Sequence, residues 1–246
     1  MTTIPLPEVA VLDLAGTTIS DEGLVLDAFF AALRDAGIPA GDARCEEVVR
    51  RMGESKITVF LDLFDQDLAL ATHANQVFEA VYAARLASGL VRPVPGARDV
   101  IVHLQGRGVR VALTTGFSPK TRDALLDAVG WRTMADLTLS PADVGRGRPF
   151  PDLALAALMR LGGSSVKALL TAGDTIADVR SGLAAGAGTV IGVLTGTHGE
   201  DDLHGAGAHL VLPSISDLPA LLTSGDGVTQ GSPAAQDNPR KGHTTQ

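Results

Sequence analysis

Short apolar segments alternate with amphipathic helical segments over the second half of the chain, and this alternation is the strongest constraint on the fold. Strands that are covered on both faces are nearly continuous apolar runs, and their alternation with helices is typical of a doubly wound parallel sheet. The sequence therefore predicts an α/β fold. The expected strands are 8–14, 109–115, 136–140, 167–174, 189–196 and 209–214, and the expected helices are 97–106, 119–129, 151–162, 177–186 and 216–222.

A helical insert separates the first expected strand from the others. Residues 24–36 have apolar residues at helical spacing, residues 43–88 continue as helical segments, and no strand is expected between about 20 and 95. The sequence thus predicts a core made of residues 1–19 and 92–223 and a helical insert over 20–91. Residues 224–246 lack apolar periodicity and are rich in Gly, Pro, Gln and Asn, so we expect a disordered tail.

Composition narrows the classes of function. The 246 residues carry a net charge of −8, without a basic block in the folded part, which argues against a nucleic-acid partner. No apolar stretch is long enough to span a membrane, and the N-terminus lacks the pattern of a secretory signal. The single cysteine, Cys45, cannot form an internal disulfide. We therefore expect a cytoplasmic protein. The sequence leaves its oligomeric state open between a monomer and a homodimer.

Polar residues follow the ends of the expected strands. Asp13 ends the first strand, Thr115 ends the second, Arg148 follows the third, and Asp174 with Asp178 follows the fourth. Ligands of open parallel sheets bind at the carboxyl ends of the strands, so these residues are candidates for one site. Taken singly, each also has a structural interpretation. The first two could be turn residues, and the arginine could be a solvated surface charge.

The segment "GDTIAD" carries the most specific of these signals. Asp174 and Asp178 are one helical turn apart on the same face, and carboxylates that close repel each other unless a cation lies between them. Oxygen ligands of this kind suit Mg²⁺. The structural alternative is a helix N-cap followed by an acid in the first turn, both favoured by the helix dipole.

Together these residues make a coherent site for phosphoryl transfer. Asp13 would be the nucleophile, because carboxylates form aspartyl phosphates in known enzymes. Thr115 would donate its hydroxyl to a phosphate oxygen, Arg148 would neutralise the charge of the phosphate, and Asp174 would bind the metal.

The order of four motifs, "DLAGT", "TTG", "GRP" and "GDTIAD", resembles the haloacid dehalogenase-like hydrolase superfamily. The wider stretches "DLAGTTIS", "VALTTGF", "SPADVGRGRPFPD" and "AGDTIADVRSG" are similar to those of its phosphonatase-like group, the phosphonoacetaldehyde hydrolases. The resemblance covers about residues 8–222. It implies a Rossmann-like core with an inserted α-helical cap. It also implies that Mg²⁺ is bound by Asp13, Asp174 and the backbone carbonyl of Ala15, with Asp178 nearby, and that Thr115, Gly116 and Arg148 bind the phosphate.

Ala15 is informative within this resemblance. Most phosphatases of the superfamily have a second aspartate at that position as the general acid. Phosphonatases have alanine, because a cap lysine forms an imine with the substrate aldehyde and so activates the leaving carbon. With alanine at position 15, the resemblance therefore implies that the cap carries a lysine whose amine forms the imine.

The cap segment "RRMGESK" (50–56) departs from the phosphonatase pattern as we align it. The imine-forming lysine, taken as the residue three before the glycine, corresponds to Arg50, and a guanidinium stays protonated and cannot form an imine. Arg50 is retained as an expected phosphate-binding residue, with Arg51 beside it. Lys56 matches the second lysine of the pattern and is either catalytic or a solvated helix residue. Because it lies six residues further on, roughly 9 Å along a helix, we expect it not to form the imine.

The leading hypothesis is a Mg²⁺-dependent hydrolase of a small phosphorylated or phosphonate metabolite that works through an aspartyl phosphate on Asp13. Lys56, His73 and Arg50 are candidates by location for the proton donor missing at Ala15. The alternative enzyme is a phosphonoacetaldehyde hydrolase with Lys56 as a relocated amine. A metal-free dehalogenase gives no reason for the aspartate pair. The non-enzyme alternative is a degenerate phosphate-binding module of the same fold.

Overall fold

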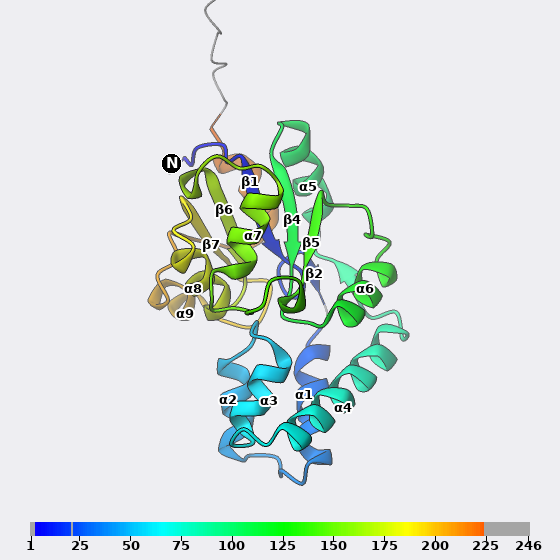
Figure 1. Cartoon of the computed structure of the whole chain (residues 1–246). Coiled ribbons are helices and arrows are strands. Elements are labelled where there is room, and N and C mark those ends of the chain that lie inside the picture. Colours follow the sequence, from blue (N-terminus) through cyan, green and yellow to red (C-terminus); the bar gives the residue numbers. More distant parts are fainter. Residues whose placement is uncertain (1–2, 21, 224–246) are drawn as a thin grey trace, which may run out of the picture.

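The computed structural model describes residues 3–20 and 22–223, and its centre is a six-stranded sheet (Figure 1). All neighbouring strands are parallel, in the order β5–β4–β1–β6–β7–β8. The chain order alternates strands and helices, as the sequence predicts for a doubly wound α/β fold. The strands are β1 (Val9–Asp13), β4 (Arg110–Thr114), β5 (Leu137–Leu139), β6 (Leu169–Gly173), β7 (Thr189–Val193) and β8 (Leu210–Leu212).

Strand β1 lies in the middle of the sheet, and every one of its residues is buried. Successive side chains of a strand point to opposite faces. Accordingly, Leu12 belongs to one hydrophobic cluster, whereas Val11 belongs to the other. A strand covered on both faces must be apolar throughout, so the one carboxylate in β1, Asp13, stands out at its end.

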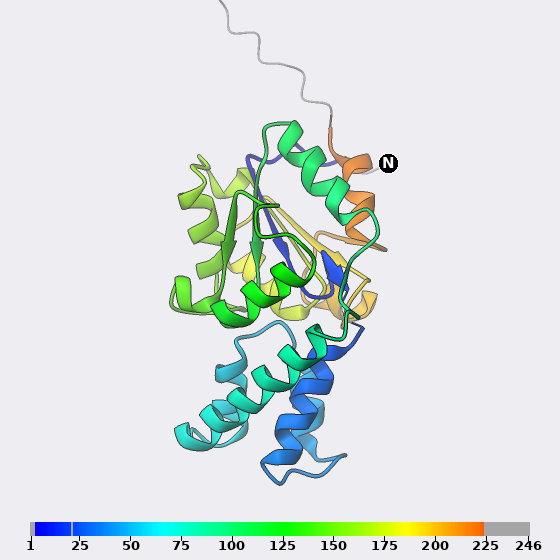
Figure 2. The ribbon, with the colours of Figure 1, turned by 90° about the vertical axis from the view of Figure 1, so that its right-hand side faces the viewer.

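Helices cover both faces of the sheet (Figure 2). The helix α5 (Ala97–Gly106) and the 3₁₀ helix Ile215–Leu221 supply side chains to the first cluster, together with α6 (Pro119–Ala128). The second cluster contains side chains of α7 (Asp152–Arg160), α8 (Ile176–Ala184) and α9 (Glu200–Gly205). The sequence did not predict α9, because six mostly polar residues carry no readable period. The expected helix 216–222 is a 3₁₀ helix with Pro219 inside.

Four further helices form a layer beyond the carboxyl ends of the strands, and we call them the cap helices (Figure 1). They are α1 (Leu24–Asp35), α2 (Ala43–Arg50), α3 (Lys56–Leu63) and α4 (Leu68–Leu86). Their interior is aromatic: the rings of Phe29, Phe60 and Phe78 pack with centroids 4.9–6.5 Å apart.

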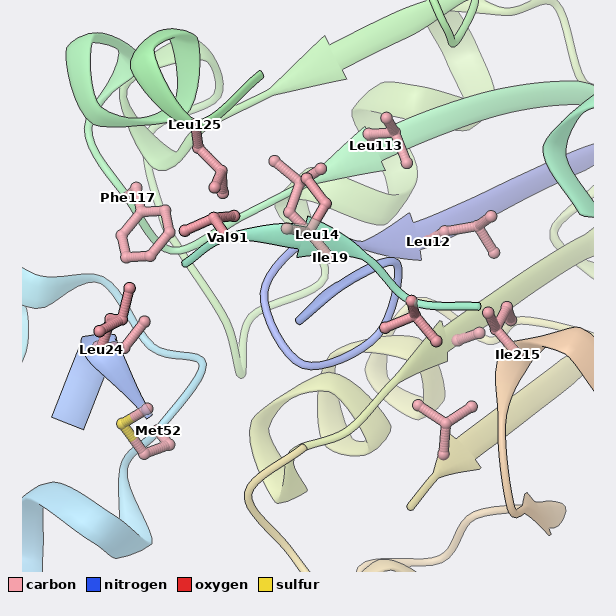
Figure 3. Packing of buried hydrophobic residues seen from close by; sticks show 14 of the residues in the cluster. Leu12, Leu14, Ile19, Leu24, Met52, Val91, Leu113, Phe117, Leu125 and Ile215 are labelled. Carbon is pink, nitrogen blue, oxygen red and sulfur yellow. The ribbon is translucent and has the colours of Figure 1, made fainter. Parts of the chain in front are cut away.

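One aromatic residue of the core extends this packing. Phe117, after β4, lies 4.9 Å from the ring of Tyr82, and in the close view it faces Leu24 and Met52 of the cap side (Figure 3). Apolar contact therefore runs without interruption from the sheet into the cap helices.

Two short strands connect the cap helices to the core. Strands β2 (Ile19–Ser20) and β3 (Arg92–Pro93) pair antiparallel, so the chain enters and leaves the cap helices side by side. The expectation of no strand between about 20 and 95 is wrong at these positions. Two residues, one of them a proline, are too few for a periodicity to appear in the sequence.

No helix within residues 3–20 and 22–223 combines the length and apolar character that a membrane span requires. The expected tail, 224–246, lies outside the described residues. At the end opposite the cap helices, Ile4 bridges Leu222, so the first and last described segments meet.

Candidate active site

The carboxyl ends of the strands and the cap helices enclose a pocket of about 340 Å³. Asp13 is the last residue of β1, Thr115 follows β4, Asp174 follows β6, and Arg148 lies between β5 and α7. The pocket is lined by all four, together with the expected Ala15, Gly116 and Lys56. The strand-end residues that the sequence singled out thus meet in one place, as the geometry of a parallel sheet requires.

Arg148 is not a surface charge. It is 4% exposed, and its Nη2 forms an ion pair with Asp13 Oδ1 at 2.6 Å while its Nη1 pairs with Asp178 Oδ1. Burial alone would lower the pKa of Arg148, but the carboxylates of Asp13 and Asp178 more than offset this and raise it. The guanidinium therefore stays charged at the floor of the pocket.

Asp174 is held by groups from two other loops. Its Oδ1 accepts a hydrogen bond from Thr17 Oγ1 at 3.0 Å, and its Oδ2 accepts one from the backbone N–H of Thr197 at 2.9 Å. Burial, with the nearby charge of Asp178, raises the pKa of Asp174 to about 7 despite these bonds. Burial raises the pKa of Asp13 well above its usual value. Arg148 opposes that shift, and the other two carboxylates add to it.

Asp178 has the structural role that the sequence offered as an alternative, and it also contacts the site. Thr175 is the N-cap of α8, and Asp178 accepts its backbone N–H at 3.1 Å and its hydroxyl, completing a capping box. The other carboxylate oxygen faces Arg148. The structural alternative is therefore correct for Asp178, with Thr175 rather than Asp174 as the cap, and it does not remove the residue from the site.

The three carboxylates suit a divalent cation. One oxygen each of Asp13, Asp174 and Asp178 lies within 4.8 Å of the others. All three residues are buried, and when they are ionised Arg148 offsets only one of three negative charges. Such a group is unfavourable without a further cation, and an all-oxygen ligand set is what Mg²⁺ prefers. The residues present thus fit the metal that the resemblance implies.

The cap contributes Lys56 to the pocket and not Arg50. Lys56 is 6% exposed, and its Nζ donates to the backbone carbonyl of Glu54 at 3.3 Å and lies 5.4 and 5.1 Å from the ring centroids of Phe29 and Phe117. The side chain of Arg50 is 70% exposed, pairs with Glu47 and does not line the pocket. The interpretation of Lys56 as a solvated helix residue is wrong.

Residues 50 and 56 do not lie on one continuous helix, as the expected spacing of roughly 9 Å requires. Helix α2 ends at Arg50 and α3 begins at Lys56, with a turn between them in which Gly53 has a left-handed backbone (φ 89°). Position 50 points to solvent, so an amine there would not face the pocket. The third candidate, His73, pairs with Asp35 and does not line the pocket either.

Several residues of the site were not predicted. Two of them, Thr17 and Thr197, donate hydrogen bonds to Asp174. A third, Thr195, donates one to the backbone carbonyl of Gly16 at 2.6 Å. The loop 195–197 follows β7, so the same strand-end rule that found Asp174 could have identified it. Thr17 stood inside the motif "DLAGT", but nothing in the sequence shows which carboxylate it would contact.

Comparisons with known proteins show which family the chain resembles. The model of the haloacid dehalogenase-like hydrolase family matches residues 7–186. A probable phosphatase, IndB of Dickeya dadantii (strain 3937), is 30% identical over 85% of this chain and 90% of that protein. A phosphonoacetaldehyde hydrolase of Hahella chejuensis (strain KCTC 2396) is 27% identical over 87% of this chain and 85% of its own length.

Solved structures show the same fold. A hydrolase from Pseudomonas syringae superposes with a TM-score of 0.77 at 24% identity, covering 87% of this chain and 96% of the other. A phosphonoacetaldehyde hydrolase-like protein from Oleispira antarctica gives a TM-score of 0.74 at 24% identity, covering 89% of this chain and 92% of the other.

Proposed function

Because this chain belongs to the haloacid dehalogenase-like hydrolase family, we propose that it is a Mg²⁺-dependent hydrolase that moves a phosphoryl group from a small phosphorylated or phosphonate metabolite to water through Asp13. One observation carries the proposal: Asp13, Asp174 and the buried Arg148 line one pocket below the cap helices, and Asp178 joins the same cluster of carboxylates behind Arg148. This combination supplies a nucleophile, a positive charge and a cation site at one point.

Asp13 acts twice in the proposed reaction. A carboxylate oxygen attacks phosphorus and forms an O–P bond, while the bond from phosphorus to the leaving group breaks and the leaving group keeps the electron pair. Water then attacks the aspartyl phosphate at phosphorus and loses a proton. Phosphate departs, and the Asp13 carboxylate is restored.

The other residues of the floor stabilise the charge of the transferring group. Arg148 presents its guanidinium beside Asp13, and Thr115 and Gly116 line the wall next to it, so the phosphate oxygens would meet donors on that side. Asp13, Asp174 and Asp178 would bind Mg²⁺, with the backbone carbonyl of Ala15 as a further ligand. The bound metal would supply positive charge, the main requirement of phosphoryl transfer.

The proton for the leaving group needs a source, because the side chain of Ala15 cannot donate one. A positioned general acid contributes roughly 10²–10⁴-fold to the rate. Of the three cap residues considered for this role, only Lys56 lines the pocket. For ordinary phosphate esters, we therefore propose that Lys56 donates the proton to the leaving group or binds the part of the substrate beyond the phosphate.

Lys56 also favours a second candidate, the hydrolysis of phosphonoacetaldehyde. Its amine would condense with the aldehyde and release water, giving a protonated imine. When Asp13 attacks phosphorus, the P–C bond breaks and its electron pair is taken up as an enamine. Protonation of the enamine and hydrolysis then release acetaldehyde and the free amine. This reaction needs no acid at position 15, and it reverses our sequence-based expectation that Lys56 forms no imine.

A phosphate-release assay over phosphate esters, acyl phosphates and phosphonates tests the proposal. We expect turnover that is lost with excess chelator and restored by Mg²⁺. Full activity in chelator would contradict the metal assignment and favour a metal-free dehalogenase. Binding of phosphate without turnover of any substrate would favour the degenerate binding module.

Reduction with borohydride in the presence of phosphonoacetaldehyde separates the two uses of Lys56. A covalent adduct on Lys56, found by peptide mass spectrometry and absent in Lys56→Met, would support the imine. A protein that stays unlabelled and active would limit Lys56 to proton donation or substrate binding.

A further inference from the structure

Arg51 lies next to Arg50 in the sequence but in a different environment. Its side chain is 16% exposed, and its guanidinium contacts two acids. Nη2 and Nε donate to Glu54 Oε2 at 2.6 and 3.1 Å, and Nη1 forms an ion pair with Asp62 Oδ2 at 2.8 Å. Arg51 therefore connects the turn between α2 and α3 to the side of α3.

The residue that Arg51 holds also orients Lys56. The backbone carbonyl of Glu54 accepts the hydrogen bond from Lys56 Nζ. The same carbonyl oxygen packs against the core at Gly116, where an ideal Cβ would lie only 2.4 Å from it. Glu54 is thus restrained at both ends, by Arg51 through its side chain and by Gly116 through its main chain.

The rest of the turn is seated equally closely on the core. An ideal Cβ on Gly53 would lie 2.3 Å from Thr175 Oγ1, and the backbone there is left-handed. The turn between α2 and α3 reaches from the cap helices toward the core (Figure 1). A small displacement of this turn would therefore move the carbonyl that orients Lys56.

We propose that Arg51 is a positioning residue that clamps Glu54 to Asp62 and thereby fixes the carbonyl that holds the Lys56 ammonium in the pocket. A planar guanidinium with several donors can contact both carboxylates at once, whereas a neutral side chain can contact neither in this way. The positioning of Lys56 can be tested without any substrate. Its consequence for turnover rests on the proposed function.

The alternative is that the ion pairs of Arg51 with Glu54 and Asp62 contribute only to the stability of the cap helices. The loss of such a pair would lower the stability of the cap helices without changing any particular side chain. The positioning role and the purely stabilising role differ in one expected result. Only the positioning role predicts that the reactivity of Lys56 changes while that of the other lysines does not.

Acetylation of lysines by acetic anhydride, followed by peptide mass spectrometry, measures this directly on the full chain. In Arg51→Met we expect the acetylation rate of Lys56 to rise severalfold relative to the exposed Lys120 and Lys167 of the same molecule. Arg44→Met is the matched control, because Arg44 pairs with Asp42 elsewhere on the cap helices. It should leave the relative rate unchanged.

A second variant and a kinetic comparison complete the test. Asp62→Asn breaks only the outer half of the clamp and gives the same readout if Arg51→Met does not fold. With phosphonoacetaldehyde, Arg51→Met should lose about 10²-fold in kcat/KM, the cost of a misplacement of about 1 Å. In the Lys56→Met background it should lose nothing more.

The outcomes are distinct. An unchanged relative acetylation rate at Lys56 in both variants, or a rise matched by the control, would overturn the positioning role. Absence of turnover by the wild-type protein on any phosphate or phosphonate would instead overturn the proposed function, and the acetylation readout would still decide the role of Arg51.

Discussion

In the absence of divalent cations, the free energy of unfolding of this protein should decrease as the pH rises from about 4 to about 8. The cause is the crowding of Asp13, Asp174 and Asp178 in a buried site with a single arginine. A buried carboxyl whose pKa is raised on folding binds its proton more tightly in the folded state than in the unfolded chain. Between the unfolded and folded pKa values the folded state therefore holds more protons, and the free energy of unfolding decreases with pH.

Asp174 gives the magnitude. Folding raises its pKa from 3.8 to about 7, which corresponds to about 4 kcal/mol at about 1.36 kcal/mol for each pH unit. This penalty is absent below about pH 4, where both states are protonated, and complete above about pH 7. For a chain of this size it lowers Tm by roughly 10 °C. Asp13, whose pKa is raised as well, adds to the effect.

Urea unfolding at pH 5 and pH 8, in chelator and in Mg²⁺, measures the effect. In chelator we expect the lower free energy of unfolding at pH 8. Mg²⁺ at about 100 times its Kd should add about 2.7 kcal/mol at pH 8. Asp174→Asn should flatten the pH dependence in chelator, whereas Asp201→Asn, an exposed acid of α9, should preserve it. A chelated protein as stable at pH 8 as at pH 5 would refute the reasoning.

Three further predictions concern single substitutions. Asp13→Asn removes the nucleophilic oxygen at nearly constant volume, so phosphate release should vanish while the protein still folds. Wild-type rates, with deamidation excluded by mass spectrometry, would show that Asp13 is no nucleophile. Phe78→Ala empties the centre of the aromatic cluster and should cost about 3–5 kcal/mol in urea unfolding, against less than about 0.5 kcal/mol for Leu68→Ala, whose residue is 65% exposed. Gly116→Ala brings a Cβ against the Glu54 carbonyl and should lower kcat/KM about 10²-fold without changing the circular dichroism spectrum. Unchanged kinetics would mean that activity does not depend on the close approach of the Glu54 carbonyl to residue 116.

The sheet and the floor of the site were predictable because both follow from simple rules. Buried parallel strands are apolar throughout, so β1 and β6 are evident in the sequence, and their carboxyl ends must meet at one edge. Asp13 and Asp174 were therefore found without any knowledge of their contacts. The two-residue strands β2 and β3 were not, because pairing that short leaves no pattern in the sequence.

In the cap segment 50–56, sequence reasoning named Lys56 as a candidate but did not find which of the basic residues faces the pocket. Which residue of the segment 50–56 faces the pocket depends on where α2 ends and on the left-handed turn at Gly53. Treating the segment as one helix ignored the turn between α2 and α3, and it suggested a role for Arg50 that its exposed side chain does not support. Likewise, the two groups that hold Asp174, Thr17 and the amide of Thr197, come from loops far apart in the chain, and only the fold brings them together.

In the proposed reaction Asp13 carries the phosphoryl group between substrate and water. Acid quenching of the protein during turnover of acetyl phosphate or phosphonoacetaldehyde with Mg²⁺, followed by peptide mass spectrometry, tests this directly. We predict a phosphoryl group on the peptide that contains Asp13, lost in chelator and absent in Asp13→Asn. Continued phosphate release without any phosphorylated protein, or a phosphoryl group on another residue, would contradict the account.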